Sequence, residues 1–330
     1  MVTMIQRKLN KSGKWWLAIK IILAVCALWF IYQKVFTHES SKNYLTQLKT
    51  ALQNPQSAFL FLIVLILMIL NWTTESLKWK FMIKKIEEIS TVRALEAVFS
   101  GLTVSFFTPN RIGEYAGRVF HLKEGKRMQA TFITMIENSS QLLITLLAGS
   151  IACMFYMSDY MEMNSWIFLL IRFLLLVFSG FCIILFFNLD LFEIFFKRFK
   201  MSEYWRQIFH VFSLYSTKEL MKVLLLSLVR YIIFSIQFYI LLRIYGSPIH
   251  LFPSLLMIAM TFFVMAVVPT FTIAEIGIRG AVAAYFFGKI TIDVLPVLNA
   301  TFSLWLINLA IPALAGAFFI FHFKLEKNGR

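Results

Sequence analysis

Six long apolar segments alternate with shorter polar segments along this chain. An α-helix needs about 20 mostly apolar residues to cross a bilayer, because the hydrocarbon core is about 30 Å thick. The pattern therefore predicts six spanning helices, at residues 15–36, 57–77, 128–157, 166–188, 220–245 and 295–323. The polar segment 37–56, between the first two, is expected to hold a short helix at the membrane surface.

Two further apolar stretches, at 95–107 and 250–268, are too short to span, and each is followed by a proline. After each proline comes the same pattern, Ile-small-Glu-x-x-x-Arg, at residues 112–118 and 273–279. Hydrophobic segments interrupted by Pro or Gly at matching places in two halves of a membrane protein point to a transporter-type binding site. We therefore predict two re-entrant or broken hairpins, with hinges at Pro109, Gly113, Pro269 and Gly277.

The charges of the polar segments predict the topology. Lys and Arg cluster before the first helix, between the second and third, in segment 189–219 and after the last, which is typical of the cytoplasmic side. Segment 158–165 carries two acids and no base, so we expect it to be external. Both termini are then cytoplasmic, and the two hairpins enter from opposite sides. The chain divides into two inverted halves, 15–157 and 166–323, each reading helix, helix, hairpin, helix. The alternative for the second hairpin is a pair of thin spanning helices.

Composition agrees with a protein that lies almost wholly in a bilayer. The chain is 59% hydrophobic and 15% charged, against about 25% charged in soluble proteins. We predict an all-α polytopic integral membrane protein, with a single membrane domain over residues 1–330, in the bacterial inner membrane. The net charge of +15 does not indicate nucleic acid, because the basic residues lie beside apolar segments, where they suit anionic lipids. The cysteines and histidines are scattered, so no metal and no cofactor are expected.

The charged residues of the two hairpins are the main site candidates. Glu114 and Arg118 are four residues apart, as are Glu275 and Arg279, so each couple shares a helical face and can pair. One interpretation is that these are structural ion pairs, since charges inside membranes commonly pair with one another. The other is that Arg111, together with the arginines of the two pairs, presents guanidinium groups to an anion such as phosphate.

Further polar residues lie in the predicted spanning helices. Glu137 in the third and Arg230 in the fifth are a natural pair between the halves. Trp72 and Trp305 lie near helix ends, which is typical of anchors at the membrane interface. No catalytic residue is expected, and the predicted substrate-binding set is Arg111, Glu114, Arg118, Glu137, Arg230, Glu275 and Arg279.

Several of these motifs resemble one known family. Residues 108–114, Thr-Pro-Asn-Arg-Ile-Gly-Glu, resemble the "PgRaGE" motif of the transmembrane region of lysylphosphatidylglycerol synthases. The same region occurs alone in flippase-like bacterial and archaeal membrane proteins. Ile136-Glu137 is similar to the start of the family's "ERxxD" helix, residues 269–279 resemble its "P…GxGvR" motif, and residues 308–316 resemble its "N…PallG" stretch.

The chain also departs from the family pattern. Asn138 and Gln141 stand in place of the family's Arg and Asp, and Gly280 stands where many members have Glu. An ion-pair scheme taken from the family therefore does not transfer whole. No soluble domain follows residue 323, so the resemblance implies a translocator-like module without the aminoacyl-transferase domain.

These observations lead us to expect a translocator, not an enzyme, for an anionic phospholipid or a lipid-linked envelope precursor. Its headgroup would occupy a wet crevice near the midplane between the inverted halves. No Walker-type ATP site is present, so movement would be passive or ion-coupled. The alternatives are an accessory scaffold for envelope lipid or glycan synthesis, and a membrane enzyme acting on a polyprenyl-phosphate or lipid headgroup with Glu114 or Glu137 as base. Besides membrane lipids, a second copy of the chain or an envelope-synthesis protein is a further possible partner.

Overall fold

The computed structural model describes residues 39–106, 108, 111–162, 164–197, 203–268 and 272–328. Throughout these ranges the secondary structure is helical, without a strand, as the sequence predicts. The first predicted helix, 15–36, lies outside the described residues, and so do the predicted hinge residues Pro109 and Pro269.

Five helices among the described residues are long and apolar enough to cross a membrane. They are α3 (Pro55–Ile83), α6 (Arg127–Tyr160), α7 (Ser165–Phe187), α10 (Thr217–Ile244) and the continuous pair α13 (Leu295–Trp305) and α14 (Ile311–Asn328). These are the second to sixth helices of the sequence prediction, which is confirmed for each. A π-helical turn, Leu306–Ala310, joins α13 to α14. Pro312 follows that turn, and its missing N–H interrupts the helical hydrogen-bond ladder there.

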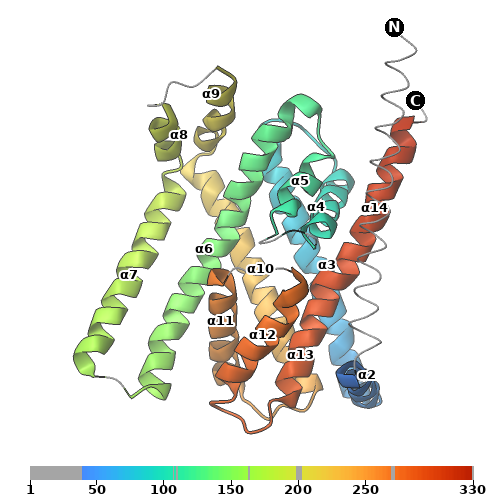
Figure 1. The fold of residues 1–330 in the computed structure, drawn as a ribbon, viewed down its shortest axis with the longest axis vertical. Coiled ribbons are helices and arrows are strands. Elements are labelled where there is room, and N and C mark those ends of the chain that lie inside the picture. The colour runs from blue at the N-terminus through green and yellow to red at the C-terminus, as the bar shows by residue number, and fades with distance from the viewer. Residues whose placement is uncertain are drawn as a thin grey trace.

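The two interrupted apolar stretches form pairs of shorter helices. The first pair is α4 (Thr91–Ser105) with α5 (Gly113–Val119), and the second is α11 (Leu251–Val267) with α12 (Thr272–Phe287). At 1.5 Å per residue even α11 is only about 26 Å long, short of a full hydrocarbon core. In Figure 1 the first pair lies in the upper half of the molecule and the second in the lower half, and each pair returns toward the end from which it starts.

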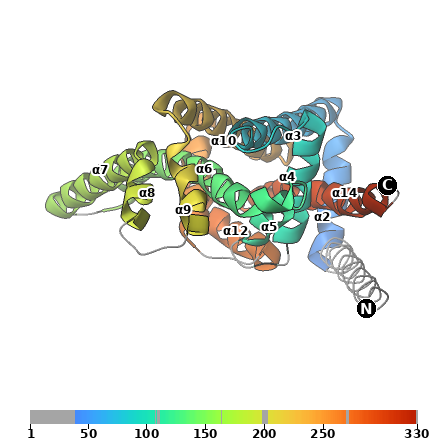
Figure 2. The ribbon, with the colours of Figure 1, turned by 90° about the horizontal axis from the view of Figure 1, so that it is seen from above.

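The remaining helices lie at the ends and edges of the bundle. They are α2 (Glu39–Leu52), α8 (Asp190–Lys197), α9 (Glu203–Phe209) and the short 3-10 turns Glu124–Lys126 and His210–Ser213. The helix α2 is the one expected within segment 37–56. Viewed from above, α7 lies at one edge of the molecule, beyond α6, while α2 and α14 lie at the other (Figure 2).

The core is made where the hairpins pack on the long helices. The helix α3 packs against α10, α4 packs against α14, and α11 packs against α6. One apolar cluster gathers around Trp79 and Trp305, which are both fully buried, and a second gathers around Phe238 and Phe287. These contacts hold both hairpins against the centre of the bundle, where their tips approach each other.

Candidate functional site

The first hairpin is closed by glycines at two close backbone approaches. Gly117 of α5 lies so near α4 that a Cβ on it would come within 2.5 Å of the Gly101 Cα. Gly113, at the start of α5, donates its N–H to the Thr108 Oγ1 at 2.7 Å, and a Cβ there would come within 2.6 Å of the Val104 carbonyl oxygen. Larger residues at either glycine would push α5 off α4. Of the four predicted hinges, Gly113 is therefore required by close packing.

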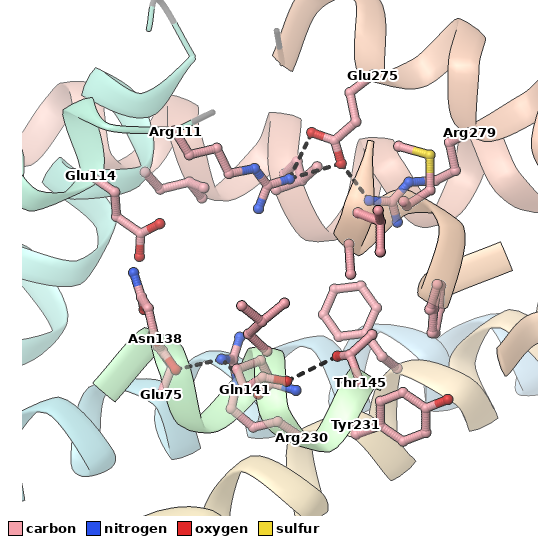
Figure 3. A pocket seen from close by; sticks show the side chains of 18 of the residues that line it. Glu75, Arg111, Glu114, Asn138, Gln141, Thr145, Arg230, Tyr231, Glu275 and Arg279 are labelled. Atoms are coloured by element: carbon pink, nitrogen blue, oxygen red, sulfur yellow. Dashed lines mark hydrogen bonds and ion pairs between the residues drawn. The ribbon is translucent and has the colours of Figure 1, made fainter. Parts of the chain in front are cut away.

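Arg111 connects the tips of the two hairpins. Its φ of 57° is in the left-handed region, which is uncommon for a residue other than glycine and carries backbone strain. Its Nη2 donates to both carboxylate oxygens of Glu275 in α12, at 2.9 and 2.8 Å. Arg279, one turn further along α12, donates to the same carboxylate. Two guanidinium groups thus share one carboxylate, and we call Arg111, Glu275 and Arg279 the hairpin triad (Figure 3).

Behind the first hairpin, Arg118 is surrounded by three carboxylates. Its side chain is fully buried, and its Nη1 donates to Glu137 of α6 at 3.0 Å. Its Nη2 donates to Glu75 of α3 at 2.5 Å and also to Glu114, one turn earlier on α5. One guanidinium therefore ties α3, α5 and α6 together in the interior.

Two more cations complete this group. Lys78 is fully buried, and its Nζ lies 3.0 Å from a Glu75 oxygen and 2.9 Å from a Glu137 oxygen. Arg230 of α10 pairs with the same Glu75 and donates its Nε–H to the Asn71 side chain at 3.0 Å. We call the six residues the buried charge cluster: Glu75, Lys78, Glu114, Arg118, Glu137 and Arg230. Its three acids and three bases balance, as buried charges must if they are to remain ionised.

A cavity of about 530 Å³ separates the hairpin triad from α6 and α10. Such a volume is typical of small-molecule and headgroup sites. In Figure 3, Glu114 and the triad lie on one side of the cavity, and Asn138, Gln141, Thr145 and Tyr231 lie on the other. The rest of the wall is largely apolar, with contributions from Phe234, Phe262, Met265, Ala266, Val267 and Val268. The cavity wall thus combines charged and polar side chains with an apolar part contributed mostly by α11.

Most of the predicted binding residues meet at this cavity. Five of the seven line it, namely Arg111, Glu114, Arg230, Glu275 and Arg279. Arg118 and Glu137 are fully buried behind the wall, where they hold Glu114 and Lys78. The two expected pairs at i and i+4 both form, Glu114 with Arg118 and Glu275 with Arg279. Direct binding by any of the seven stays a prediction.

Three expectations about individual residues are wrong. Glu137 does not pair with Arg230, because Arg118 and Lys78 lie closer to it and Arg230 is taken by Glu75. The sequence prediction counts Lys78, which directly follows the predicted helix 57–77, among the loop charges between the second and third helices. It is not a loop charge, because α3 continues past it to Ile83 and buries it completely. Trp72 and Trp305 are not interface anchors: both are buried, at 7% and 0% exposure, and Trp72 lines the cavity.

The polar face of α3 is absent from the predicted binding set. Asn71, Glu75 and Lys78 are spaced at i, i+4 and i+7, so they share one face of an otherwise apolar helix. This spacing is the signal that could have identified them. The last predicted hinge, Gly277, lies inside α12 with open space around its Cα, so packing does not demand a glycine there.

The fold and the charged interior define a multi-pass α-helical membrane protein with a cavity at the meeting point of two broken hairpins. By sequence, the chain belongs to the family of the lysylphosphatidylglycerol synthase transmembrane region, whose sequence model matches residues 15–316. This membership ties it to membrane-lipid and envelope metabolism. No curated protein gave a significant match. No solved structure did so either.

Proposed function

We propose that this protein moves an anionic phospholipid or a lipid-linked envelope precursor between the leaflets of the bacterial inner membrane. The headgroup would occupy the cavity between the hairpin tips and α6, while the tails remain against the apolar wall and the surrounding lipid. The observation that carries this proposal is the charge of the hairpin triad. It sets two guanidinium groups against one carboxylate, so it carries one uncompensated positive charge beside the cavity.

An anionic headgroup supplies the missing negative charge. The buried charge cluster is already balanced, and its ion pairs join side chains of four helices, α3, α5, α6 and α10. Arg111, by contrast, is 35% exposed, and Glu275 is the one ion-pair partner it has among the described residues. A phosphate can accept hydrogen bonds from two arginine forks, so it would bind to Arg111 and Arg279 beside Glu275 and supply the negative charge that the triad lacks. The arginines of the triad are therefore the proposed headgroup ligands.

The packing supports an inverted arrangement of two halves. If the halves are exchanged, α4 takes the place of α11 and α6 takes the place of α13 and α14. The contact of α4 with α14 then corresponds to the contact of α11 with α6. The helices α3 and α10 correspond to each other, and they also pack against each other. Each of these two helix contacts has a glycine at its closest approach. A Cβ on Gly316 of α14 would collide with Phe99 of α4, and a Cβ on Gly149 of α6 would collide with Phe263 of α11. Such repeats place a substrate near the midplane and expose it to each side in turn.

Cysteine labelling tests the orientation. In a variant without native cysteines, single cysteines at Glu162 and Ile292, both exposed, are expected to react with an impermeant thiol reagent added to intact cells. Cysteines at Lys84 and Glu124, which are 68% and 80% exposed, are expected to react only after the cells are opened. We expect this difference because Lys and Arg cluster beside positions 84 and 124, which is typical of the cytoplasmic side. Labelling of position 84 or 124 in intact cells would contradict the inverted topology.

Transport in liposomes tests the function itself. Purified protein is expected to accelerate the transbilayer exchange of a headgroup-labelled anionic lipid, and to do so less for a zwitterionic lipid. Without protein the exchange is slow, because desolvating a charged headgroup costs several kcal/mol or more. Liposomes with heat-inactivated protein are the control. Exchange without acceleration for any anionic or polyprenyl-linked lipid would argue for a scaffold, and a chemically altered lipid would argue for an enzyme.

A further inference from the structure

The connection between α7 and α10 places large apolar side chains on the surface of the molecule. Leu191, Ile194 and Phe195 of α8, and Tyr204 and Trp205 of α9, are each between 40% and 58% exposed. We call these five residues the apolar platform. Apolar side chains gathered on the surface of a folded protein mark a contact with lipid or with another protein. The sequence prediction treats segment 189–219 as a cytoplasmic loop, so the platform is a feature that loop charge alone does not reveal.

Aromatic rings join α8 to α9 and both helices to the bundle. Ring-centroid distances of 5.6, 6.4 and 5.9 Å separate the successive rings of Phe192, Phe212, Phe209 and Trp205. Phe132 of α6 packs edge-on against Phe209 and Phe212, with centroids 5.4 and 5.8 Å away. The platform is therefore fixed to α6 by packed rings.

The helix α8 is amphipathic, but its charged side faces inward. Glu193, in the middle of α8, is buried, and its Oε1 lies 3.3 Å from the Nδ1 of His210. Because each residue turns a helix by about 100°, Leu191 and Phe195 lie on the opposite side of α8, and both are exposed. A helix that faces water has the reverse arrangement, with its apolar side inward. The outer side of α8 thus suits apolar surroundings.

The length of α7 places the platform near the edge of the hydrocarbon core. The helix has 23 residues and is therefore about 35 Å long, slightly more than the core thickness of about 30 Å. It ends at Phe187, and α8 begins three residues later, at Asp190, directly beyond the end of α7 (Figure 1). The platform therefore begins at the depth of the lipid headgroups. Tyr and Trp are enriched at this depth.

The surface of α7 that faces lipid leads up to the platform. Phe186 is the one buried residue of α7, and the helix lies at the edge of the molecule (Figure 2). Phe181 and Ile184, in its last two turns, are exposed. A bilayer that covers these side chains reaches the start of α8 as well. A soluble partner protein would have to bind at a depth that lipid headgroups occupy.

We infer that α8 and α9 form a membrane-surface anchor, with the lipid bilayer as the partner of the apolar platform. The platform lies in the boundary between headgroups and acyl chains of the leaflet in which α7 ends. Arg206, on the opposite side of α9 from Tyr204, faces water. Because Phe132 ties α6 to the same rings, the anchor also fixes the depth of α6, the helix that carries Gln141 of the cavity wall. The anchor does not depend on whether the protein moves a lipid.

Depth-dependent quenching tests the anchor in the full-length protein, reconstituted in lipid nanodiscs. In a variant without native cysteines, the fluorophore bimane is attached to a single cysteine at Ile194, Tyr204 or Arg206. Lipids brominated near the top of the acyl chains are expected to quench about half of the emission at positions 194 and 204, because the apolar side of an interfacial helix lies about 5–10 Å deep in the boundary region. Bimane at position 206, where the native side chain is 58% exposed, is expected to keep most of its emission.

Two results would overturn the inference. Emission that is insensitive to bromine at all three positions would place the platform in water and leave a protein as its partner. Equal quenching at all three would contradict the assignment of Tyr204 to the lipid side of α9 and Arg206 to the water side.

A charge placed on the platform sharpens the test. Leu191→Glu puts a carboxylate into the boundary region, so quenching of bimane at Ile194 is expected to fall to the level found at Arg206. Arg206→Glu changes the charge by two units on the water-facing side and is expected to leave quenching at Ile194 unchanged. Both native side chains are exposed, so unfolding in detergent should stay close to wild type. Equal effects of the two variants on quenching would overturn the platform assignment.

Discussion

Replacing Arg118 by methionine is expected to lower the free energy of unfolding in detergent by about 3–5 kcal/mol, the range measured when one partner of a buried ion pair is removed. Arg118 is fully buried between Glu75, Glu114 and Glu137. Without it, the three carboxylates would face only Lys78 and Arg230, and the cluster would hold an excess negative charge in the membrane interior. Denaturant or thermal unfolding, followed by tryptophan fluorescence, measures the effect.

A surface pair provides the control. Arg206 and Glu203 lie 3.7 Å apart with both side chains mostly exposed, so Arg206→Met is expected to change stability by less than about 1 kcal/mol. Combining Arg118→Met with Glu137→Gln removes one charge of each sign and should recover part of the loss. If Arg118→Met is as stable as Arg206→Met, the buried charge cluster does not hold the helices together as described.

Replacing Arg279 by alanine is expected to slow the transport of anionic lipid by about 10–100-fold, the loss that corresponds to one or two charge-assisted hydrogen bonds. Stability should fall by less than half of the loss at Arg118, because Glu275 keeps its contacts of 2.9 and 2.8 Å with Arg111. Lipid exchange in liposomes and unfolding in detergent are measured on the same preparation. A large loss of stability with unchanged transport per folded molecule would show that the hairpin triad is structural only.

Two variants make this result specific. Arg279→Lys keeps the positive charge but loses the planar fork, so its transport rate is expected to lie between wild type and Arg279→Ala. Lys84→Ala removes a charge that is 68% exposed at the end of α3 and should leave transport unchanged. A matched decrease in Lys84→Ala would mean that net charge, and not the cavity, controls the rate.

Much of the fold could be predicted because it depends on local properties of the chain. The span that contains Asn71 and Trp72 is recognisable since some 20 apolar residues around them suffice to cross a bilayer. The hairpins are recognisable because short apolar runs end at prolines. The pairs Glu114–Arg118 and Glu275–Arg279 follow from helix geometry alone, as four residues make about one turn.

Less of the site could be predicted, because it depends on which helices meet. Lys78 looked like a loop charge since hydropathy falls after residue 77, yet α3 continues and Glu137, far along the chain, neutralises it. The pairing of Glu137 with Arg230 was wrong for the same reason: Glu75 lies between them and takes the arginine.

By itself, the sequence determined that this is an all-helical membrane protein with two broken hairpins and ionisable residues at their tips. Those features follow from hydropathy, proline positions and helical spacing, which are properties of neighbouring residues. Only the tertiary structure decided that Arg111 contacts Glu275 across the two hairpins, and that a neutral wall on α6 faces them. The Arg111–Glu275 contact joins residues 164 positions apart, and its formation depends on how all the helices pack at once.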